Sequence, residues 1–328
     1  MSKQLSLGVL DFCSVPGKTS VYALSSTIQL ARQVEVFGYS RYWLTEHHSV
    51  TAHASPELLI PTIAGMTKRI RVGTAGILLY FYSPLKVVEN FKLLETLFRG
   101  RVDLGLCRGK ASPLITKELL DGRTRELDLD LYQEKFESLL HFLQDSSSVN
   151  VPPAGLAIPE VWSLGSGWNS MRLAAQNGVA YSHSLFHKGA QHDPDIIQEY
   201  QETFQARLIS SPKSNIAVAG ICANTETKAY ELLKQHTNSF VIPTVVGSAS
   251  QCKEKLQALQ ERFGVNEIIF LDVCHELEDR LRSYELLATE FGLGDNPGNS
   301  IKATESSLAE KNRRLVSSGS KSGQNTIS

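Results

Sequence analysis

The sequence predicts an α/β protein and, within that class, a closed (β/α)₈ barrel. Short runs rich in Val, Ile and Leu alternate with longer segments of helical period, which is typical of βα units around a parallel sheet. Eight alternations within roughly 290 residues favour a barrel over an open, doubly wound sheet, which stays the alternative. The expected strands are Leu5 to Leu10, Arg41 to Glu46, Ile70 to Leu78, Val102 to Leu106, Glu160 to Leu164, Val179 to His183, Asn215 to Cys222 and Glu267 to Asp272.

The helical segments are bounded by glycines or polar turns. One expected helix, Ala23 to Phe37, stops at Gly38, and another, Phe91 to Phe98, ends at Gly100; glycine suits the left-handed position after a helix. We expect one barrel domain over residues 1–295. The polar, Ser/Gly/Lys-rich residues 296–328 cannot bury enough apolar area to offset chain entropy, so we expect a disordered tail.

Composition excludes several classes of function. The chain has 328 residues and a formal net charge of -1, and no basic run tracks a phosphate backbone, so we expect no nucleic-acid partner. Neither a leader sequence nor an apolar run of about 18 residues occurs, so we expect a cytoplasmic protein without a membrane partner. Five widely spaced cysteines without a C-x-x-C pair predict reduced thiols.

Glu46, His47 and His48 lie where a predicted strand ends, at the edge where parallel barrels carry their chemistry. Because adjacent side chains of an extended segment diverge, we expect only one histidine to face the barrel mouth, as acid or base. Glu46 would fix its tautomer or pair with an arginine. The alternative is a histidine merely hydrogen-bonded in a loop, and no third ligand supports a metal site.

Cys107 and Arg108 follow another strand between glycines that let a ligand approach the backbone. The Arg108 guanidinium suits a phosphate, or alternatively a carboxylate at the barrel rim. Cys107 is a candidate thiol nucleophile, although contact with a bound ring is at least as well supported.

A Gly/Ser turn containing Ser166, Gly167 and Ser170 opens the helix expected from Met171 to Gln176. Such a turn presents unpaired N–H groups and the positive end of the helix dipole, which together bind phosphate. Alternatively, Asn169 or Ser170 merely caps the helix.

Substrate-facing positions are suggested by aromatic and strand-end residues. Ala75 and Gly76 are small residues at a strand end, where a flat ligand could lie against the backbone, although ordinary barrel filling is the simpler interpretation. Tyr80 and Trp168 would supply walls, and His183 at another strand end would face the substrate. A purely structural histidine is the alternative there.

Several of these motifs occur together in one known family. Between about residues 5 and 291 the chain resembles the bacterial luciferase-like family of flavin-dependent monooxygenases. The motifs that carry the resemblance are Tyr42 to His48, Arg71 to Gly76, Gly100 to Gly109, Leu164 to Gly167 and Arg280 to Leu287.

The resemblance implies a barrel that binds reduced FMN and uses O₂ through a C4a-peroxyflavin to oxygenate an aldehyde or specialised metabolite. By the family pattern, His47 is catalytic and Cys107 lies beside the reactive edge of the flavin ring. The ring would pack on the Ala75–Gly76 peptide, which is often cis in the family. The phosphate would be held by Arg108, Ser166, Gly167 and Ser170.

Departures from luciferase favour a non-luminescent member. Residues 110–114 (KASPL) lack the aspartate that supports the luciferase histidine, and Ser166 replaces an acidic residue. No further G-x-G-x-x-G unit is present for a nicotinamide, so a separate NAD(P)H:flavin reductase would supply FMNH₂. The resemblance also implies a homodimer. The alternatives are an F420-dependent hydride-transfer oxidoreductase and a non-catalytic flavin-binding protein.

Overall fold

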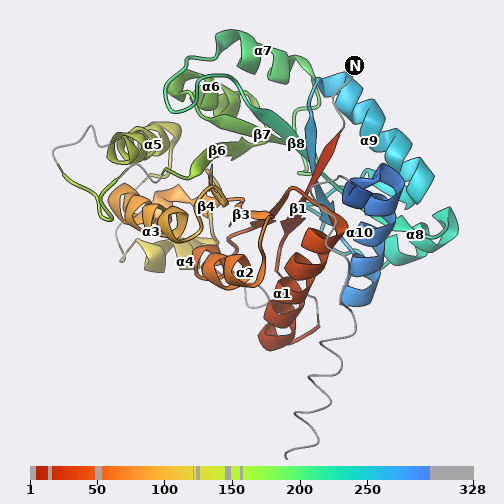
Figure 1. Ribbon diagram of the computed structural model, residues 1–328. Coiled ribbons are helices and arrows are strands. Elements are labelled where there is room, and N and C mark those ends of the chain that lie inside the picture. Colours follow the sequence, from red (N-terminus) through yellow and green to blue (C-terminus); the bar gives the residue numbers. More distant parts are fainter. Residues whose placement is uncertain are drawn as a thin grey trace, which may run out of the picture. The chain divides into compact units, whose positions relative to one another are not determined.

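A computed structural model describes residues 5–13, 17–48, 54–120, 122, 126–144, 149–155 and 158–295. Eight parallel strands form a closed barrel, because β10 pairs with β1 on one side and with β8 on the other (Figure 1). The predicted (β/α)₈ barrel is therefore confirmed. The barrel strands are β1 (Ser6–Asp11), β2 (Arg41–Leu44), β3 (Arg71–Thr74), β5 (Val102–Cys107), β6 (Glu160–Gly165), β7 (Ala180–Ser184), β8 (Ser214–Ala223) and β10 (Glu267–Asp272).

Two strands differ from the sequence prediction. The single strand expected from Ile70 to Leu78 is divided into β3 and a two-residue strand, β4 (Ile77–Leu78), which pairs with β5. The cis peptide Ala75–Gly76 lies between them. A further strand, β9 (Val245–Ser248), pairs with β8 outside the barrel and was not predicted, because four residues carry too little periodic signal.

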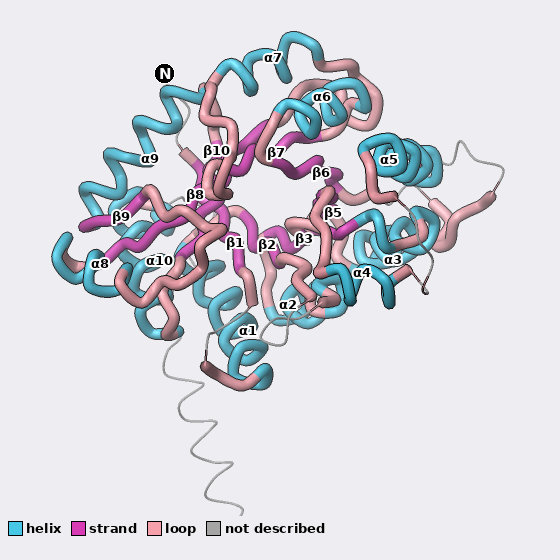
Figure 2. Tube along the Cα trace, turned by 180° about the vertical axis from the view of Figure 1, so that it is seen from behind, coloured by secondary structure: helices cyan, strands magenta, loops and turns pink. Residues whose placement is uncertain are grey.

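Helices surround the strands (Figure 2). As predicted, the first ends at Phe37 with Gly38 in the left-handed region at φ 94°. The second expected end is wrong by one residue, because α3 stops at Leu97 and Gly100 lies in the following turn at φ 77°. The helices are α1 (Ser20–Phe37), α2 (Ile60–Met66), α3 (Pro84–Leu97), α4 (Pro113–Leu119), α5 (Leu129–Leu143), α6 (Trp168–Asn177), α7 (Asp195–Thr203), α8 (Glu226–Leu233), α9 (Ala249–Phe263) and α10 (Leu277–Phe291), with 3₁₀ turns η1 (Pro56–Leu58), η2 (Leu79–Phe81) and η3 (Leu293–Asp295).

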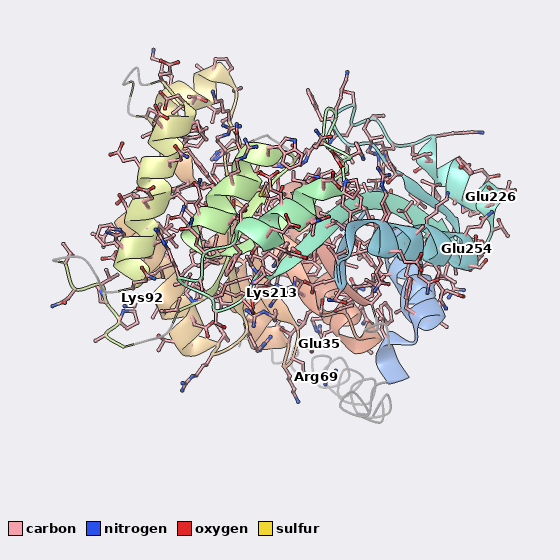
Figure 3. The ribbon with its side chains drawn as sticks, turned by 90° about the horizontal axis from the view of Figure 1, so that it is seen from above. Glu35, Arg69, Lys92, Lys213, Glu226 and Glu254 are labelled. Atoms are coloured by element: carbon pink, nitrogen blue, oxygen red, sulfur yellow. The ribbon has the colours of Figure 1, made fainter. Side chains whose placement is uncertain are left out.

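Helix α1 is tied to the start of β3 by one carboxylate. Glu35 Oε1 accepts hydrogen bonds from the backbone N–H groups of Lys68, Arg69 and Ile70 at 2.7, 2.6 and 3.0 Å. Figure 3 shows Glu35 and Arg69 side by side. The bonds satisfy donors that would otherwise face solvent at the strand entry, and so set where β3 begins.

Residues Met1–Leu293 form one compact unit. The tail expected over residues 296–328 lies outside the described residues. Among the helices that the structure describes, none is both long and apolar enough to cross a membrane.

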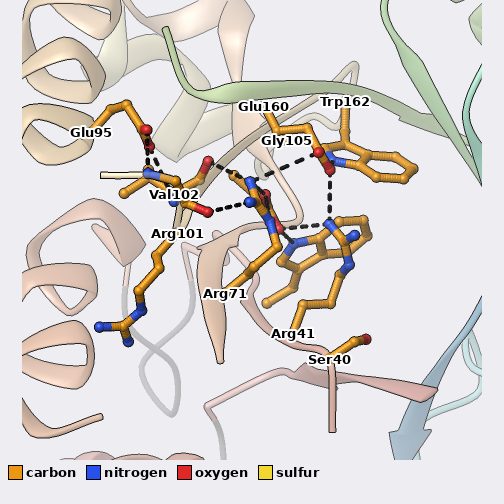
Figure 4. Close-up of polar contacts among 12 residues, drawn as sticks. Ser40, Arg41, Arg71, Glu95, Arg101, Val102, Gly105, Glu160 and Trp162 are labelled. Atoms are coloured by element: carbon orange, nitrogen blue, oxygen red, sulfur yellow. Dashed lines mark hydrogen bonds and ion pairs between the residues drawn. The ribbon is translucent and has the colours of Figure 1, made fainter. Parts of the chain in front are cut away.

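Charged side chains fill the barrel at the amino ends of its strands (Figure 4). Arg41, the first residue of β2, donates to Asp103 on β5, Glu160 on β6 and Glu267 on β10 at 2.7, 3.2 and 2.8 Å. We call these four residues the Arg41 cluster. Arg71 also reaches Asp103, so every carboxylate of the cluster faces at least one guanidinium.

The Arg41 cluster is held in its charged form by mutual attraction. Burial alone would raise the pKa of Glu160, but Arg41 and Arg71 outweigh it and hold the pKa at about 2. The pKa of Glu267 is lowered against the same burial effect, mainly by Arg41. Burial is tolerated because each charge is paired and hydrogen-bonded.

Above the cluster, the barrel interior turns apolar. Trp43 and Trp162 meet edge to face, with ring centroids 5.2 Å apart, and pack with Ala217 and Ile269. Each indole N–H is satisfied by a carboxylate of the Arg41 cluster, Asp103 for Trp43 and Glu160 for Trp162. The two tryptophans thus separate the charged amino end of the barrel from its carboxyl end.

Replacing Arg41 by Met should lower the free energy of unfolding by about 3–5 kcal/mol, because buried carboxylates lose their partner. Urea unfolding measures this change. The matched control is Arg282→Met, since Arg282 is half exposed and pairs with Glu285 on the same helix. That control should cost under about 1 kcal/mol. Equal losses in the two variants would contradict a central role for Arg41.

The lowered carboxylate pKa values also predict how stability depends on pH. Glu160 titrates near its ordinary range when unfolded but at about 2 when folded, so its stabilisation is complete above the unfolded pKa. It is lost as the pH falls toward 2. Glu160→Gln should therefore flatten the fall in unfolding free energy measured between about pH 6 and pH 3. A slope identical to that of the wild-type protein would show that Glu160 carries no such linkage.

Candidate functional site

A cavity of about 1060 Å³ opens at the carboxyl ends of the barrel strands. Its floor is the apolar layer that includes Trp43 and Ile269. Most of the residues singled out from the sequence line it together, as expected for strand ends that meet at one edge. These are His47, Ala75, Gly76, Cys107, Arg108, Ser166, Gly167, Trp168 and Ser170.

Both histidines after β2 line the cavity, so the expectation that only one faces it is wrong. The strand ends at Leu44, and the alternation rule does not apply to the non-strand residues beyond it. Glu46 orients His48 rather than His47: its Oε1 lies 2.7 Å from His48 Nε2. His47 instead meets the ring of Phe12 edge on, with centroids 4.8 Å apart.

The Glu46 carboxylate is buried and surrounded by donors. Tyr82 donates its hydroxyl to Oε1 at 2.8 Å, and the Leu78 N–H donates to Oε2 at 2.9 Å. Burial nevertheless raises the pKa of Glu46 above its usual range. The carboxylate can therefore hold His48 in one orientation and exchange a proton with it more readily than an exposed glutamate could.

Cys107 lies against the peptide that joins β3 to β4. Its thiol donates to the carbonyl oxygen of Gly76, with Sγ 3.4 Å from the oxygen. Burial raises the pKa of Cys107 to about 11, so the side chain is a neutral thiol at physiological pH. This supports a role as a cavity wall and argues against a nucleophile.

Close packing behind this wall requires glycine at position 105. A Cβ there would lie 2.0 Å from the Thr74 carbonyl oxygen, a distance that real side chains do not reach. Thr74 also donates its hydroxyl to the Gly105 carbonyl at 3.0 Å. Strands β3 and β5 therefore approach each other closely behind the cavity residues Ala75, Gly76 and Cys107.

The Gly/Ser turn after β6 leads directly into α6. Gly167 is the N-cap residue and no side chain caps the helix, so the alternative in which Asn169 or Ser170 is only a cap is wrong. Ser170 instead donates to the Gly167 carbonyl at 2.8 Å. The Gly167 N–H makes no hydrogen bond to another described residue. The helix start is therefore available to an anion.

Two arginines lie at this side of the cavity. Arg108 is exposed and forms no ion pair with the residues that the structure describes, which favours a ligand over the alternative of a rim carboxylate. Arg172 on α6 also lines the cavity; its Nε lies 3.5 Å from Glu199 and its guanidinium lies over the Trp168 ring. Sequence reasoning missed Arg172, because one arginine in an amphipathic helix carries no distinctive signal.

Two residues expected at the substrate do not line the cavity. Tyr80 lies in η2 with its ring buried and its hydroxyl donating to the Asp128 carbonyl. Its neighbour Tyr132, 5.5 Å away between ring centroids, lines the cavity in its place. An aromatic wall was correctly expected, but Tyr132 comes from α5, which no strand-end pattern indicates.

His183 is the second correction. Ser182 and Ser184 line the cavity, and the alternation of β7 turns the residue between them toward the helices. His183 is completely buried there, with partners at both ring nitrogens. The period of two along β7 separates His183 from Ser182 and Ser184, but the sequence alone does not say which of the two faces lines the cavity.

All five cysteines are free, as predicted. Within the described residues, no group of three or more His, Cys, Asp or Glu side chains could hold a metal ion.

Comparison with known proteins identifies the family of this barrel. Residues 6–262 match the family model of luciferase-like monooxygenases. The Bacillus subtilis protein YwcH is 34% identical, over 88% of this chain and 99% of its own length. This chain belongs to the luciferase-like monooxygenase family.

Solved structures of the luciferase-like fold agree. The structure of apo-MsnO8 superposes with a TM-score of 0.80 at 29% identity and covers 88% of this chain and 99% of its own. The oxygenating constituent of 3,6-diketocamphane monooxygenase from Pseudomonas putida, solved with FMN, gives a TM-score of 0.68 at 18% identity. It covers 88% of this chain and 98% of its own.

The raised pKa of Cys107 predicts slow alkylation of this thiol. At about pH 8 only about one molecule in a thousand would carry the thiolate, since the pKa is about 11. N-ethylmaleimide should therefore modify Cys107 at least about a hundredfold more slowly in the folded protein than in urea. Peptide mass spectrometry reports the modification at this site alone. Rapid labelling of the folded protein would instead support a reactive cysteine.

Proposed function

We propose that this luciferase-like protein is the oxygenase component of a two-component monooxygenase that uses FMNH₂ and O₂ to oxygenate a small organic substrate. The observation that carries the proposal is one cavity that joins the uncapped start of α6, the small residues Ala75 and Gly76, and the adjacent histidines His47 and His48. The Pseudomonas putida protein that shares the fold is itself an oxygenating constituent and binds FMN.

The donors at one side of the cavity fit the FMN phosphate. The uncapped start of α6 offers N–H groups, Ser166 offers a hydroxyl, and Arg108 offers a guanidinium without an ion-pair partner among the described residues. Ser170, also expected at the phosphate, donates its hydroxyl to the Gly167 carbonyl and so supports the turn instead. Helix start and guanidinium both favour a dianion. The isoalloxazine ring would lie against Ala75, Gly76 and Cys107.

Reduced FMN, when bound, supplies the electrons that activate O₂. The protein must then exclude water and manage protons. Phe12, Phe186 and Trp43 line the interior and keep it apolar, while His47 and His48 lie at the polar side. We assign His47 the catalytic role, because it lines the cavity just beyond the end of β2, where the family resemblance places the catalytic histidine.

His48 differs from His47 because its ring is bound to Glu46. Because His48 Nε2 is directed to Glu46, Nδ1 is the ring nitrogen left for a ligand in the cavity that His48 lines. We propose that His48 accepts a proton from the ligand at Nδ1 and later returns it, while Glu46 and Tyr82 keep the ring in place.

Two partners follow from the proposal. A separate NAD(P)H:flavin reductase would deliver FMNH₂, because no G-x-G-x-x-G motif for a nicotinamide occurs in the sequence. A second copy of the chain would cover the apolar side chains that η1, α2 and α3 expose. These are Leu58, Met66, Leu93 and Leu97.

Single-turnover oxidation tests the proposal. The protein is saturated with FMNH₂ without oxygen, mixed with O₂ and a panel of aldehydes and thioethers, and the products are analysed by mass spectrometry with ¹⁸O₂. His47→Ala should lower product formation by about 10²–10⁴-fold, because proton transfer is lost. Binding of FMN should change less than about threefold, since His47 does not lie at the phosphate turn.

His236→Ala is the matched control, because His236 lies outside this cavity and its ring bonds the Val241 carbonyl. It should leave product formation unchanged. Binding of F420 with hydride transfer, and no ¹⁸O in any product, would assign the chain to the F420-dependent alternative. Binding of FMN without either reaction would support a flavin-binding protein.

A further inference from the structure

His183 does not line the cavity, yet both of its ring nitrogens have hydrogen-bond partners. Tyr181 OH lies 2.7 Å from Nδ1, and the Gln191 carbonyl oxygen lies 2.7 Å from Nε2. Because a carbonyl only accepts, Nε2 carries the proton and donates to Gln191. Burial lowers the pKa of His183, which favours this neutral ring with Nδ1 accepting from Tyr181.

Gln191 connects His183 to the turn before α6. The Gln191 backbone N–H donates to the Ser166 carbonyl oxygen at 2.8 Å. Ser166 lines the cavity and follows β6, the strand that pairs with the β7 strand of His183. Two consecutive hydrogen bonds therefore run from a buried ring on β7 to the proposed phosphate turn.

The second of these bonds sets the direction of a cavity donor. The peptide between Ser166 and Gly167 is planar and trans, so its C=O and N–H point in opposite directions. Since the carbonyl faces Gln191, the Gly167 N–H is directed away from Gln191. It makes no hydrogen bond to a described residue, and Gly167 lines the cavity.

The residues that follow Gln191, His192 and Asp193, make hydrogen bonds within their own segment and one exposed contact to α9. The Gln191 side-chain Oε1 accepts from the N–H groups of His192 and Asp193 at 3.0 and 3.3 Å. Arg262 donates to the His192 carbonyl at 2.7 Å in an exposed contact. The bond from His183 is partly buried and ties this segment to a completely buried ring on β7, so it costs more to break than an exposed bond.

We propose that His183 is a positioning residue for the phosphate of FMN: it holds Gln191, which fixes the Ser166 carbonyl and thereby aims the Gly167 N–H at the phosphate. The inference rests on the proposed FMN function. It assigns the buried strand-end histidine to recognition of the phosphate, which distinguishes FMN from riboflavin.

Comparing FMN with riboflavin isolates this effect, because the two ligands share the ring and ribityl chain but only FMN carries the phosphate. Dissociation constants are measured for both by quenching of flavin fluorescence. His183→Phe keeps a buried ring but removes the donor to Gln191. The Kd for FMN should rise about tenfold, the size of one buried hydrogen bond, and the Kd for riboflavin should change less than about twofold.

Two further variants separate positioning from general stability. His183→Gln places an amide N–H near the Nε2 position and should restore most of the preference for FMN. Tyr200→Phe removes a buried hydroxyl that donates to the Val179 carbonyl at 2.8 Å, close to β7 but off the path to Gln191. It should lower Tm without changing the ratio of the two dissociation constants.

Equal weakening of FMN and riboflavin in His183→Phe would overturn the inference, because the residue would then support only the fold. An unchanged Kd for both ligands would also overturn it. If the wild-type protein binds FMN no more tightly than riboflavin, it has no phosphate site. The proposed FMN function would then fail together with the inference about His183.

Discussion

The barrel depends on the Arg41 cluster, which satisfies three carboxylates from three strands with one buried guanidinium. Each charge is costly to bury alone, so the cluster is stable only when β2, β5, β6 and β10 are in register. The tryptophan pair of β2 and β6 is hydrogen-bonded to the same carboxylates. Closure of the barrel and packing of its interior are therefore one cooperative arrangement.

The Arg41 cluster lies at the amino ends of the barrel strands, so the carboxyl ends are available for the functional site. The cavity residues are held by backbone positions that the barrel determines, and some of their donors stay available to a ligand. The α6 start is uncapped, and Arg108 has no ion pair within the described part of the chain. Stability and binding are thus separated along the strand direction, as in other barrels of this type.

Charges of both signs line the cavity. Arg108, Lys110 and Arg172 are cationic, whereas the carboxylate of Glu46, beyond the end of β2, lies beside His48. Cys107 lies in the cavity wall as a neutral thiol because burial raises its pKa. A ligand with an anionic tail and a flat ring satisfies this arrangement better than a uniformly charged one would.

The residues behind the cavity determine how well its donors are aimed. Glu46 fixes His48, Thr74 fixes the backbone of Gly105, and Gln191 fixes the carbonyl of Ser166. Glu46 and His48 are two residues apart in the sequence. The other two contacts join residues far apart in the chain, which no local sequence pattern indicates. Such supporting contacts convert loosely placed loop residues into a defined site.

The sequence by itself determined the fold class, the eight barrel strands and the clustering of His47, Cys107, Arg108 and Gly167 at one edge. It could do so because apolar periodicity is local and parallel strands share a carboxyl edge. Only the tertiary structure decided that Glu46 serves His48, that Tyr132 replaces Tyr80 and that His183 lies behind the cavity. Those outcomes depend on contacts between elements far apart in the chain, and on where each strand ends, neither of which local pattern encodes.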